Sequence, residues 1–192
     1  ADIVVNENVL KSDGTLKDGT FKEWTPIGLI DASFNEYPYT GTFDGQSHTI
    51  SGFYFKENSA RNIGFFGYVG KGGNISNVGI CDSYFGAAVL VAGVCGYNYG
   101  GTITNCYNAG SVNGTEYYIG GVCGENIYGK IENCYNTGTV NGSEEVGGVC
   151  GCSYEGTMTN CNNTGNVSGT DGVGGVCGRN GYGTITNCNS SG

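Results

Sequence analysis

Short runs of apolar and β-branched residues recur along the chain, separated by glycine-rich turns. In the second half each recurrence contains three such runs: a VCG run preceded by Val or Ile, a TITNC run and an SVNG run. The runs are the length of short strands, and no segment shows a sustained apolar period of a helix. The pattern therefore predicts an all-β chain whose strands are joined by tight turns.

Four near-copies of one segment make up residues 93–192, and a degenerate copy containing GFFG and ISNV precedes them. The first cysteine of each copy recurs after 28, 27 and 27 residues, and a second cysteine follows each first one by 11 residues. The two positions hold Cys95, Cys123, Cys150 and Cys177, and Cys106, Cys134, Cys161 and Cys188. Such a period indicates a solenoid, because one repeat cannot bury its apolar face without a stacked neighbour.

Three short strands and their turns fit one triangular coil. We therefore predict an all-β, right-handed β-solenoid, a three-sided parallel β-helix of about seven coils and roughly 34 Å in length at about 4.8 Å per coil. The expected repeats are residues 63–91, 92–119, 120–146, 147–173 and 174–192. Residues 1–62 are expected to form irregular N-terminal coils that cap the stack, since terminal repeats are atypical. The whole is one continuous domain, and we expect it to be a fragment of a longer protein.

Two other repeat folds share some of these features. Leucine-rich repeats also place Asn or Cys after a strand, but this chain has only 4 leucines and no helical segment. Calcium-binding nonapeptide solenoids need a GGxGxD spacing, which the sequence lacks. The β-helix remains the predicted fold.

Composition and charge narrow the function. The 38 glycines alone would suit a disordered chain, but Val, Ile, Thr and the 14 tyrosines are too plentiful for that. A net charge of -9 with only 8 Lys and Arg argues against nucleic-acid binding. No apolar run approaches membrane-spanning length, so no membrane insertion is expected of this segment.

The cysteines occupy repeated strand positions, apart from Cys81 and Cys152. Equivalent residues in adjacent coils lie about 4.8 Å apart, which exceeds the usual disulfide Cβ separation near 3.8 Å. We expect small buried hydrophobes that fill a narrow core, with cross-core disulfides such as Cys95 to Cys106 as the alternative. The predicted core comprises the eight repeated cysteines together with Ile103, Ile131, Met158 and Ile185. CxxC pairs are missing and His48 is the single histidine, so no metal or cofactor is expected.

Strand alternation gives one further expectation. If the first cysteine of each repeat faces inward, the preceding valine faces outward. Such a valine row would be an apolar stripe and a candidate contact surface, although flanking glycines also permit the inverse assignment. The row would consist of Val94, Val122, Val149 and Val176.

Tyrosine supplies the candidate binding residues. Exposed stacked rings bind sugars through their faces while the hydroxyl forms hydrogen bonds, although the same rings can simply cover turn backbone. The candidates precede a turn glycine or follow the second cysteine: Tyr99, Tyr128, Tyr154, Tyr182, Tyr107 and Tyr135. A column of asparagines is expected at a corner, where Asn tolerates left-handed geometry. It comprises Asn105, Asn133, Asn160 and Asn187.

Catalysis is the competing class, because β-helices include polysaccharide lyases and hydrolases. The acidic residues of the repeats fall at differing repeat positions, mainly in turns, and no nucleophile–base pair is apparent. We therefore predict that this segment is not an enzyme.

The string GGVCGYNYGGTITNCYNAGSV resembles the GLUG repeat of bacterial surface proteins. The upstream strings WTPIG, GTFDGQSHTISGF and NIGFFG resemble the segment that leads into such repeats, so the resemblance covers nearly the whole chain. This chain departs from it by placing Cys where Val is frequent in GGLVG. The family occurs in bacterial adhesins and large secreted proteins, including some immunoglobulin A metalloproteases, and carries no catalytic residues.

The resemblance implies a cell-surface or secreted location and an adhesive role, with a structural spacer that displays another domain as the alternative. The expected partners are host glycans or surface and matrix proteins. Self-association is expected end to end or through the valine row.

Overall fold

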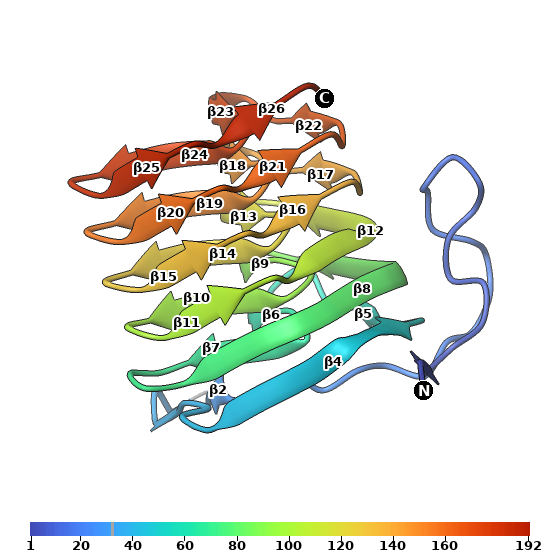
Figure 1. Cartoon of the computed structure of the whole chain (residues 1–192). Coiled ribbons are helices and arrows are strands. Elements are labelled where there is room, and N and C mark those ends of the chain that lie inside the picture. Colours follow the sequence, from blue (N-terminus) through green and yellow to red (C-terminus); the bar gives the residue numbers. More distant parts are fainter. Residues whose placement is uncertain (32) are drawn as a thin grey trace.

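The computed structural model describes residues 1–31 and 33–192. All regular elements in these residues are β-strands, and they form a stack of coils (Figure 1). Three large sheets run along the stack, and their adjacent strands pair in parallel. The predicted three-sided parallel β-solenoid is confirmed. No helix in the described residues has the length and hydrophobicity that a bilayer crossing needs.

Two of the sheets contain one strand from each coil. The first sheet consists of β6 (Arg61–Ile63), β9 (Val89–Val91), β13 (Tyr117–Gly120), β18 (Glu144–Gly147) and β23 (Asp171–Gly174). The second sheet consists of β7 (Phe66–Val69), β10 (Cys95–Tyr99), β14 (Cys123–Ile127), β19 (Cys150–Tyr154) and β24 (Cys177–Gly181).

The third sheet is wider and has 14 strands. Its early strands are long: β4 (Thr42–Ser51), β8 (Asn74–Ala87) and β12 (Tyr107–Gly114). One half continues as β11 (Thr102–Thr104), β15 (Lys130–Glu132), β20 (Thr157–Thr159) and β25 (Thr184–Thr186). The other half continues as β16 (Tyr135–Asn136), β21 (Asn162–Asn163), β26 (Asn189–Ser190), β17 (Val140–Asn141) and β22 (Val167–Ser168). The strands β1 (Ile3–Val4) and β5 (Tyr54–Lys56) complete it.

The stack has five full coils, because the first and second sheets each hold five strands. Beneath them lies a partial coil formed by β4, β5 and the isolated bridges from Ile27 to Phe66 and Tyr39 to Val69. The expectation of about seven coils was too high. The reason is that part of the N-terminal segment forms side structures instead of coils, including the antiparallel pair β2 (Leu29–Ile30) and β3 (Glu36–Tyr37).

The three predicted runs do not each form one face. The chain bends at Gly121–Val122, so the first run is divided between β13 on the first sheet and β14 on the second. The second and third runs share the third sheet, because the long strand β8 pairs with both β11 and β12.

The predicted outward valine row is wrong. Val94, Val122 and Val149 are fully buried, as are the cysteines that follow them. The bend between the first and second sheets interrupts strand alternation, so both the valine and the cysteine of each repeat enter the core. A valine-row contact surface is therefore not available, and only the terminal Val176 is partly exposed.

The core consists of columns of equivalent side chains. Ile103, Ile131 and Met158 are fully buried, and adjacent members of their column pair in register. Ile185 ends this column and is 36% exposed, because no coil covers the last one. Six of the repeated cysteines are buried, and the two in the last coil, Cys177 and Cys188, are partly exposed.

Glycine pairs allow the coil to bend tightly. A Cβ at Gly120 would collide with the Cys123 carbonyl, and a Cβ at Gly121 would collide with the side chain of Asn136. The predicted corner asparagines do adopt left-handed geometry, which is confirmed by φ angles of 52° to 55°. They are Asn105, Asn133, Asn160 and Asn187, preceded by Asn77 in the coil before.

A hairpin-like N-terminal arm, residues 9–18, lies beside the stack (Figure 1). Val9 is fully buried, and the backbone N–H groups of Val9 and Leu10 donate to the two carboxylate oxygens of Asp82 at 3.1 and 2.8 Å. Leu10 bridges to Leu16 across the arm. The base of the arm is thus fixed to the solenoid.

Candidate functional site

One tyrosine from each repeat lies at the turn that joins the second sheet to the third. Tyr99 and Tyr154 end their strands, whereas Tyr128 and Tyr182 lie one position later, in left-handed conformations with φ of 54° and 59°. Tyrosine therefore alternates between two adjacent positions from coil to coil. We call this set of four residues the turn edge.

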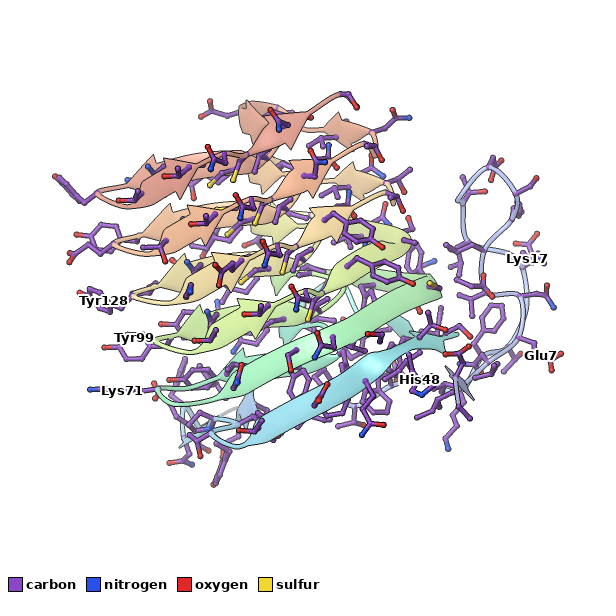
Figure 2. All side chains as sticks on the ribbon, viewed as in Figure 1. Glu7, Lys17, His48, Lys71, Tyr99 and Tyr128 are labelled. Carbon is purple, nitrogen blue, oxygen red and sulfur yellow. The ribbon has the colours of Figure 1, made fainter. Side chains whose placement is uncertain are left out.

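The rings of the turn edge form two edge-to-face pairs. Tyr99 and Tyr128 have ring centroids 5.8 Å apart at 82°, and Tyr154 and Tyr182 have centroids 5.8 Å apart at 88°. Tyr128 is 54% exposed and Tyr182 is 88% exposed. Figure 2 shows Tyr99 and Tyr128 projecting sideways from the turns along one flank of the stack. The edge thus offers solvent-facing ring surface on a rigid scaffold.

The hydroxyl of Tyr128 is protonated at neutral pH, as an ordinary phenol is. The negative charge of Glu155 is the main cause that raises the pKa of Tyr128 above its ordinary value of 10. The phenol can therefore donate a hydrogen bond at neutral pH. A ring face together with a phenolic donor suits a sugar or a polar protein surface.

The other two candidate tyrosines lie apart from the turn edge, on the third sheet. Tyr107 and Tyr135 stack with centroids 4.7 Å apart and planes 5° from parallel. A Cβ at Gly79 would collide with the Tyr107 ring, so this ring lies flat over Gly79 in the preceding coil. In the next coil Asn162 takes the equivalent position, so the row of stacked rings ends at Tyr135. The six predicted tyrosines thus form two separate aromatic surfaces.

The ten cysteines are all free thiols. Cys95, Cys123, Cys150 and Cys177 pair in register along the second sheet, as the column argument expected. Burial raises the pKa of the Cys123, Cys134 and Cys150 thiols well above the ordinary value. Such thiols are neutral, unreactive core groups.

No group of three or more His, Cys, Asp or Glu side chains in the described part of the chain has the arrangement of a metal site.

Two ladders of buried asparagines were not predicted. Asn108, Asn136 and Asn163 are fully buried; the Asn108 amide donates to the side-chain oxygen of Asn136 at 2.8 Å, and that of Asn136 donates to Asn163 at 2.9 Å. Asn98 donates to Asn126 in the same way at 2.8 Å. In the sequence the asparagines of each ladder recur at the same position of successive repeats. The neighbouring glycines and tyrosines, however, made these positions resemble turns.

A cluster of ionisable groups lies at the seam between the first and second sheets. The seam residues are Tyr118, Glu125, Glu145, Cys152 and Arg179. The Nη1 atom of Arg179 donates to Oε1 of Glu145 at 2.7 Å, while Oε2 of Glu145 is buried with no partner in the described residues. Glu125, Cys152 and Arg179 are aligned in one register column of the second sheet.

Glu125 is the perturbed group of this seam. Burial, and then the charge of Glu145, raise the pKa of the Glu125 carboxyl to about 7. Sequence inspection missed the pair because the two glutamates come from different strands and from different repeat positions. The stacking of consecutive coils brings them together.

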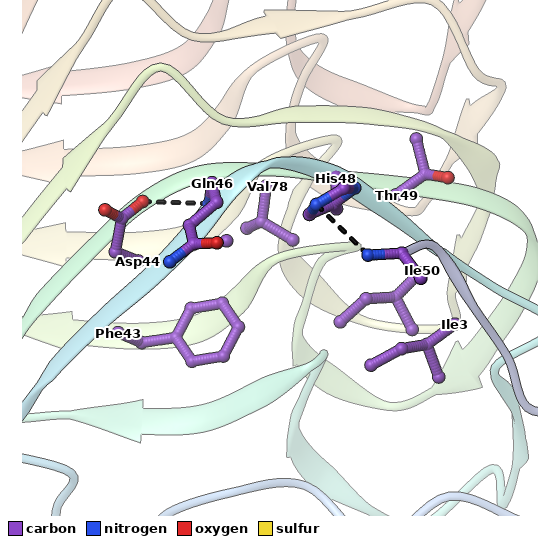
Figure 3. A pocket seen from close by; sticks show the side chains of 10 residues that line it. Ile3, Phe43, Asp44, Gln46, His48, Thr49, Ile50 and Val78 are labelled. Carbon is purple, nitrogen blue, oxygen red and sulfur yellow. Dashed lines mark hydrogen bonds between the residues drawn. The ribbon is translucent and has the colours of Figure 1, made fainter.

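A cavity of about 310 Å³ opens near the N-terminus (Figure 3). Phe43, Ile50 and Val78 form an apolar lining, and His48 lies at its rim. The Nδ1 atom of His48 is 3.3 Å from a carboxylate oxygen of Asp2. The same oxygen accepts the backbone N–H of Thr49 at 2.8 Å. The polar groups of this rim are thus largely paired with one another.

Comparison with protein families matches the GLUG motif to residues 87–113, 115–141, 142–168 and 169–192. A protein of Evansella cellulosilytica described as a "Putative Gly-rich membrane protein" is 33% identical over 80 residues, which are 40% of this chain and 9% of that protein. The crystal structure of a "putative immunoglobulin A1 protease" from Bacteroides ovatus matches with a TM-score of 0.63 and 21% identity, over 88% of this chain and 56% of that one. This chain thus spans a small part of the first protein and about half of the second, and the structural likeness shows a shared fold.

Proposed function

Since the chain belongs to the GLUG-motif family, whose motif matches four consecutive repeats, we propose that it is a non-catalytic adhesion module of a bacterial cell-surface or secreted protein. Its ligand is a glycan or a host protein, bound at the turn edge. The description of one relative as a membrane protein supports a location at the cell envelope.

The observation that carries this proposal is the exposure of the turn-edge rings. Large aromatic side chains usually bury their surface, yet Tyr128, in a coil covered on both sides, holds its ring in water at a backbone conformation that disfavours non-glycine residues. The equivalent position in an earlier coil is Gly100, so the turn itself does not need a tyrosine. A functional reason for the rings is the simplest account.

A role without catalysis fits the chemistry of the repeats. The cysteines are mostly buried thiols, and the perturbed carboxyl of Glu125 lies beside the ion pair of Arg179 and Glu145 and does not line the cavity near the N-terminus. The structure described as a putative immunoglobulin A1 protease is 21% identical, and a shared fold does not by itself imply a shared activity.

The test is a binding screen of the whole chain against a glycan array, immobilised mucin, fibronectin and collagen. The variant Tyr128→Gly/Tyr182→Gly removes both turn rings, and glycine is at ease in the left-handed conformation. Tyr37→Ala removes a tyrosine of similar exposure (57%) elsewhere and is the matched control.

The expected result is saturable binding that the double variant loses and the control keeps. Absence of binding to every surface by the folded chain would contradict adhesion and favour the spacer role. Binding that survives in the double variant would move the adhesive site away from the turn edge.

A further inference from the structure

Two cavities lie between the N-terminal arm and the corner of the solenoid. Their volumes are about 390 and 230 Å³. Asp13, Gly14, Ser111 and Thr139 line both cavities, so the two adjoin beneath the tip of the arm. Together they form one groove, and we call it the arm groove. Its larger part falls within the range of roughly 300–1,000 Å³ typical of small-molecule sites.

The walls of the arm groove are held in place on both sides. On the arm, the Asp13 carboxylate accepts the backbone N–H and the hydroxyl of Thr15 at 2.9 and 2.6 Å. On the solenoid, Thr139 donates its hydroxyl to Ser111 at 3.0 Å, and Asn141 donates its amide to Asn113 at 3.0 Å. Since the base of the arm is also bound to Asp82, the groove is preformed rather than assembled by a ligand.

One wall of the larger cavity contains an aromatic ring. Tyr84 packs against Tyr54 with centroids 6.3 Å apart and planes 27° from parallel. A Cβ at Gly86 would lie 2.8 Å from the Tyr84 ring, so the ring lies closely over Gly86. Burial raises the pKa of Tyr84, and its hydroxyl therefore stays protonated. Tyr84 thus provides a fixed ring with a polar end.

Charges of both signs surround this ring. Asp18 and Lys56 line the larger cavity and are exposed, and neither forms an ion pair or a side-chain hydrogen bond within the described residues. Lys17 and Asp13 add one further charge of each sign. A phosphate or another anion would meet two carboxylates, and a metal cation would meet two ammonium groups.

A neutral ligand rich in hydroxyl groups satisfies all of these groups at once. Its hydroxyls donate to carboxylates and accept from ammonium and amide groups, while the C–H face of a sugar ring packs on an aromatic ring. We propose that the arm groove is a binding site for a neutral saccharide, with Tyr84 beneath the sugar ring and Asp18 and Lys56 at its hydroxyls. This site is distinct from the turn edge and does not depend on the adhesive role proposed for it.

The test is isothermal titration and saturation-transfer NMR on the whole chain. The probes are lactose, cellobiose, maltose and N-acetyllactosamine, with sialyllactose, inorganic phosphate and Ca²⁺ as charged competitors. The groove variants are Asp18→Ala and Lys56→Ala, because both side chains are exposed and their removal is expected to leave the fold intact. The matched controls are Asp171→Ala and Lys71→Ala, which remove exposed charges elsewhere.

We expect a neutral disaccharide to bind, and each groove variant to weaken it about tenfold, the effect of losing one hydrogen bond to a charged group. The matched controls are expected to bind unchanged. Tyr128→Gly/Tyr182→Gly is expected to keep the binding of these soluble disaccharides and to lose only the binding to immobilised ligands that is proposed for the turn edge. Three outcomes would overturn the proposal: no neutral disaccharide binds at millimolar concentration, a charged probe binds more tightly, or the groove variants bind like wild type. Loss of saccharide binding in the tyrosine double variant alone would support the turn edge and reject the arm groove.

Discussion

Two register-aligned columns of the solenoid differ sharply in composition. In the interior column Asn108, Asn136 and Asn163 are identical, fully buried, and hydrogen-bonded from coil to coil. In the second sheet one column aligns Tyr68, Tyr97, Glu125, Cys152 and Arg179, and only the two tyrosines are alike. We call it the outer column.

The difference follows from what each position must satisfy. A buried amide needs a hydrogen-bonding partner, here a polar side chain of the next coil, because an unpaired polar group in the core is strongly unfavourable. A residue on the outer face can form hydrogen bonds with water, so its identity does not depend on the residue in the next coil. The stack is therefore specified by its interior, and the outer positions are free to carry binding groups.

Substitution inside the ladder is expected to have the largest effect. Asn136→Leu removes the hydrogen bonds to Asn108, Asn163 and the Gly138 carbonyl, and leaves buried partners unpaired. We expect a loss of about 3–5 kcal/mol in the free energy of unfolding, measured by urea denaturation. The matched control is Ser190→Ala, in the same column but exposed, with an expected loss below about 1 kcal/mol. Equal losses would contradict the role assigned to burial.

Truncation of the apolar column ranks second. Ile131→Ala opens a cavity at a fully buried position, and about 3 kcal/mol of stability should be lost. Ile185→Ala makes the same change in the uncovered last coil, where the side chain is 36% exposed. Its expected loss is about 1 kcal/mol. The difference between the two losses, measured by urea denaturation, gives the stabilisation that a covering coil adds at this column, and equal losses would contradict it.

The pH dependence of the seam ranks third. The Glu125 carboxyl has a pKa of about 7 in the fold against 4.5 as its ordinary value, so the folded state binds its proton more tightly than the unfolded state does. The stabilisation is complete below 4.5 and is lost as the pH rises through 7. Stability should therefore fall by about 2 kcal/mol between pH 5 and pH 8, after allowance for the partial exposure of this residue.

The other shifted groups of the seam titrate outside this window. The pKa of Tyr118 and that of Cys152 are each raised to about 12. Glu125→Gln should therefore flatten the pH dependence, measured as urea midpoints at pH 5 and pH 8. If Glu125→Gln lost as much stability between pH 5 and pH 8 as wild type does, the pH dependence would belong to another group.

The smallest effect on stability is expected at the turn edge. Tyr128→Gly removes a ring that is 54% exposed and relieves a left-handed non-glycine residue. The free energy of unfolding should change by less than about 0.5 kcal/mol. A loss above 2 kcal/mol in thermal or urea unfolding would mean that the ring holds the turn together.

The sequence predicted features that depend on local geometry and period. The spacing of Cys95, Cys123 and Cys150 defined the coil, and the corner asparagines showed their left-handed conformation in advance. Prediction from the sequence failed where a bend of the chain or a neighbouring coil decides whether a side chain is buried and what it contacts. Val122 is buried because the chain turns at Gly121, and Glu125 meets Glu145 only through stacking.

The account rests on a separation between an interior that holds the stack and an outer edge that binds. Its most direct test is to measure mucin binding and urea unfolding on the same samples of wild type and of Tyr128→Gly/Tyr182→Gly. The account predicts that binding is lost while the unfolding midpoint stays within error of wild type. Binding that persists, or binding that falls only in step with stability, would contradict it.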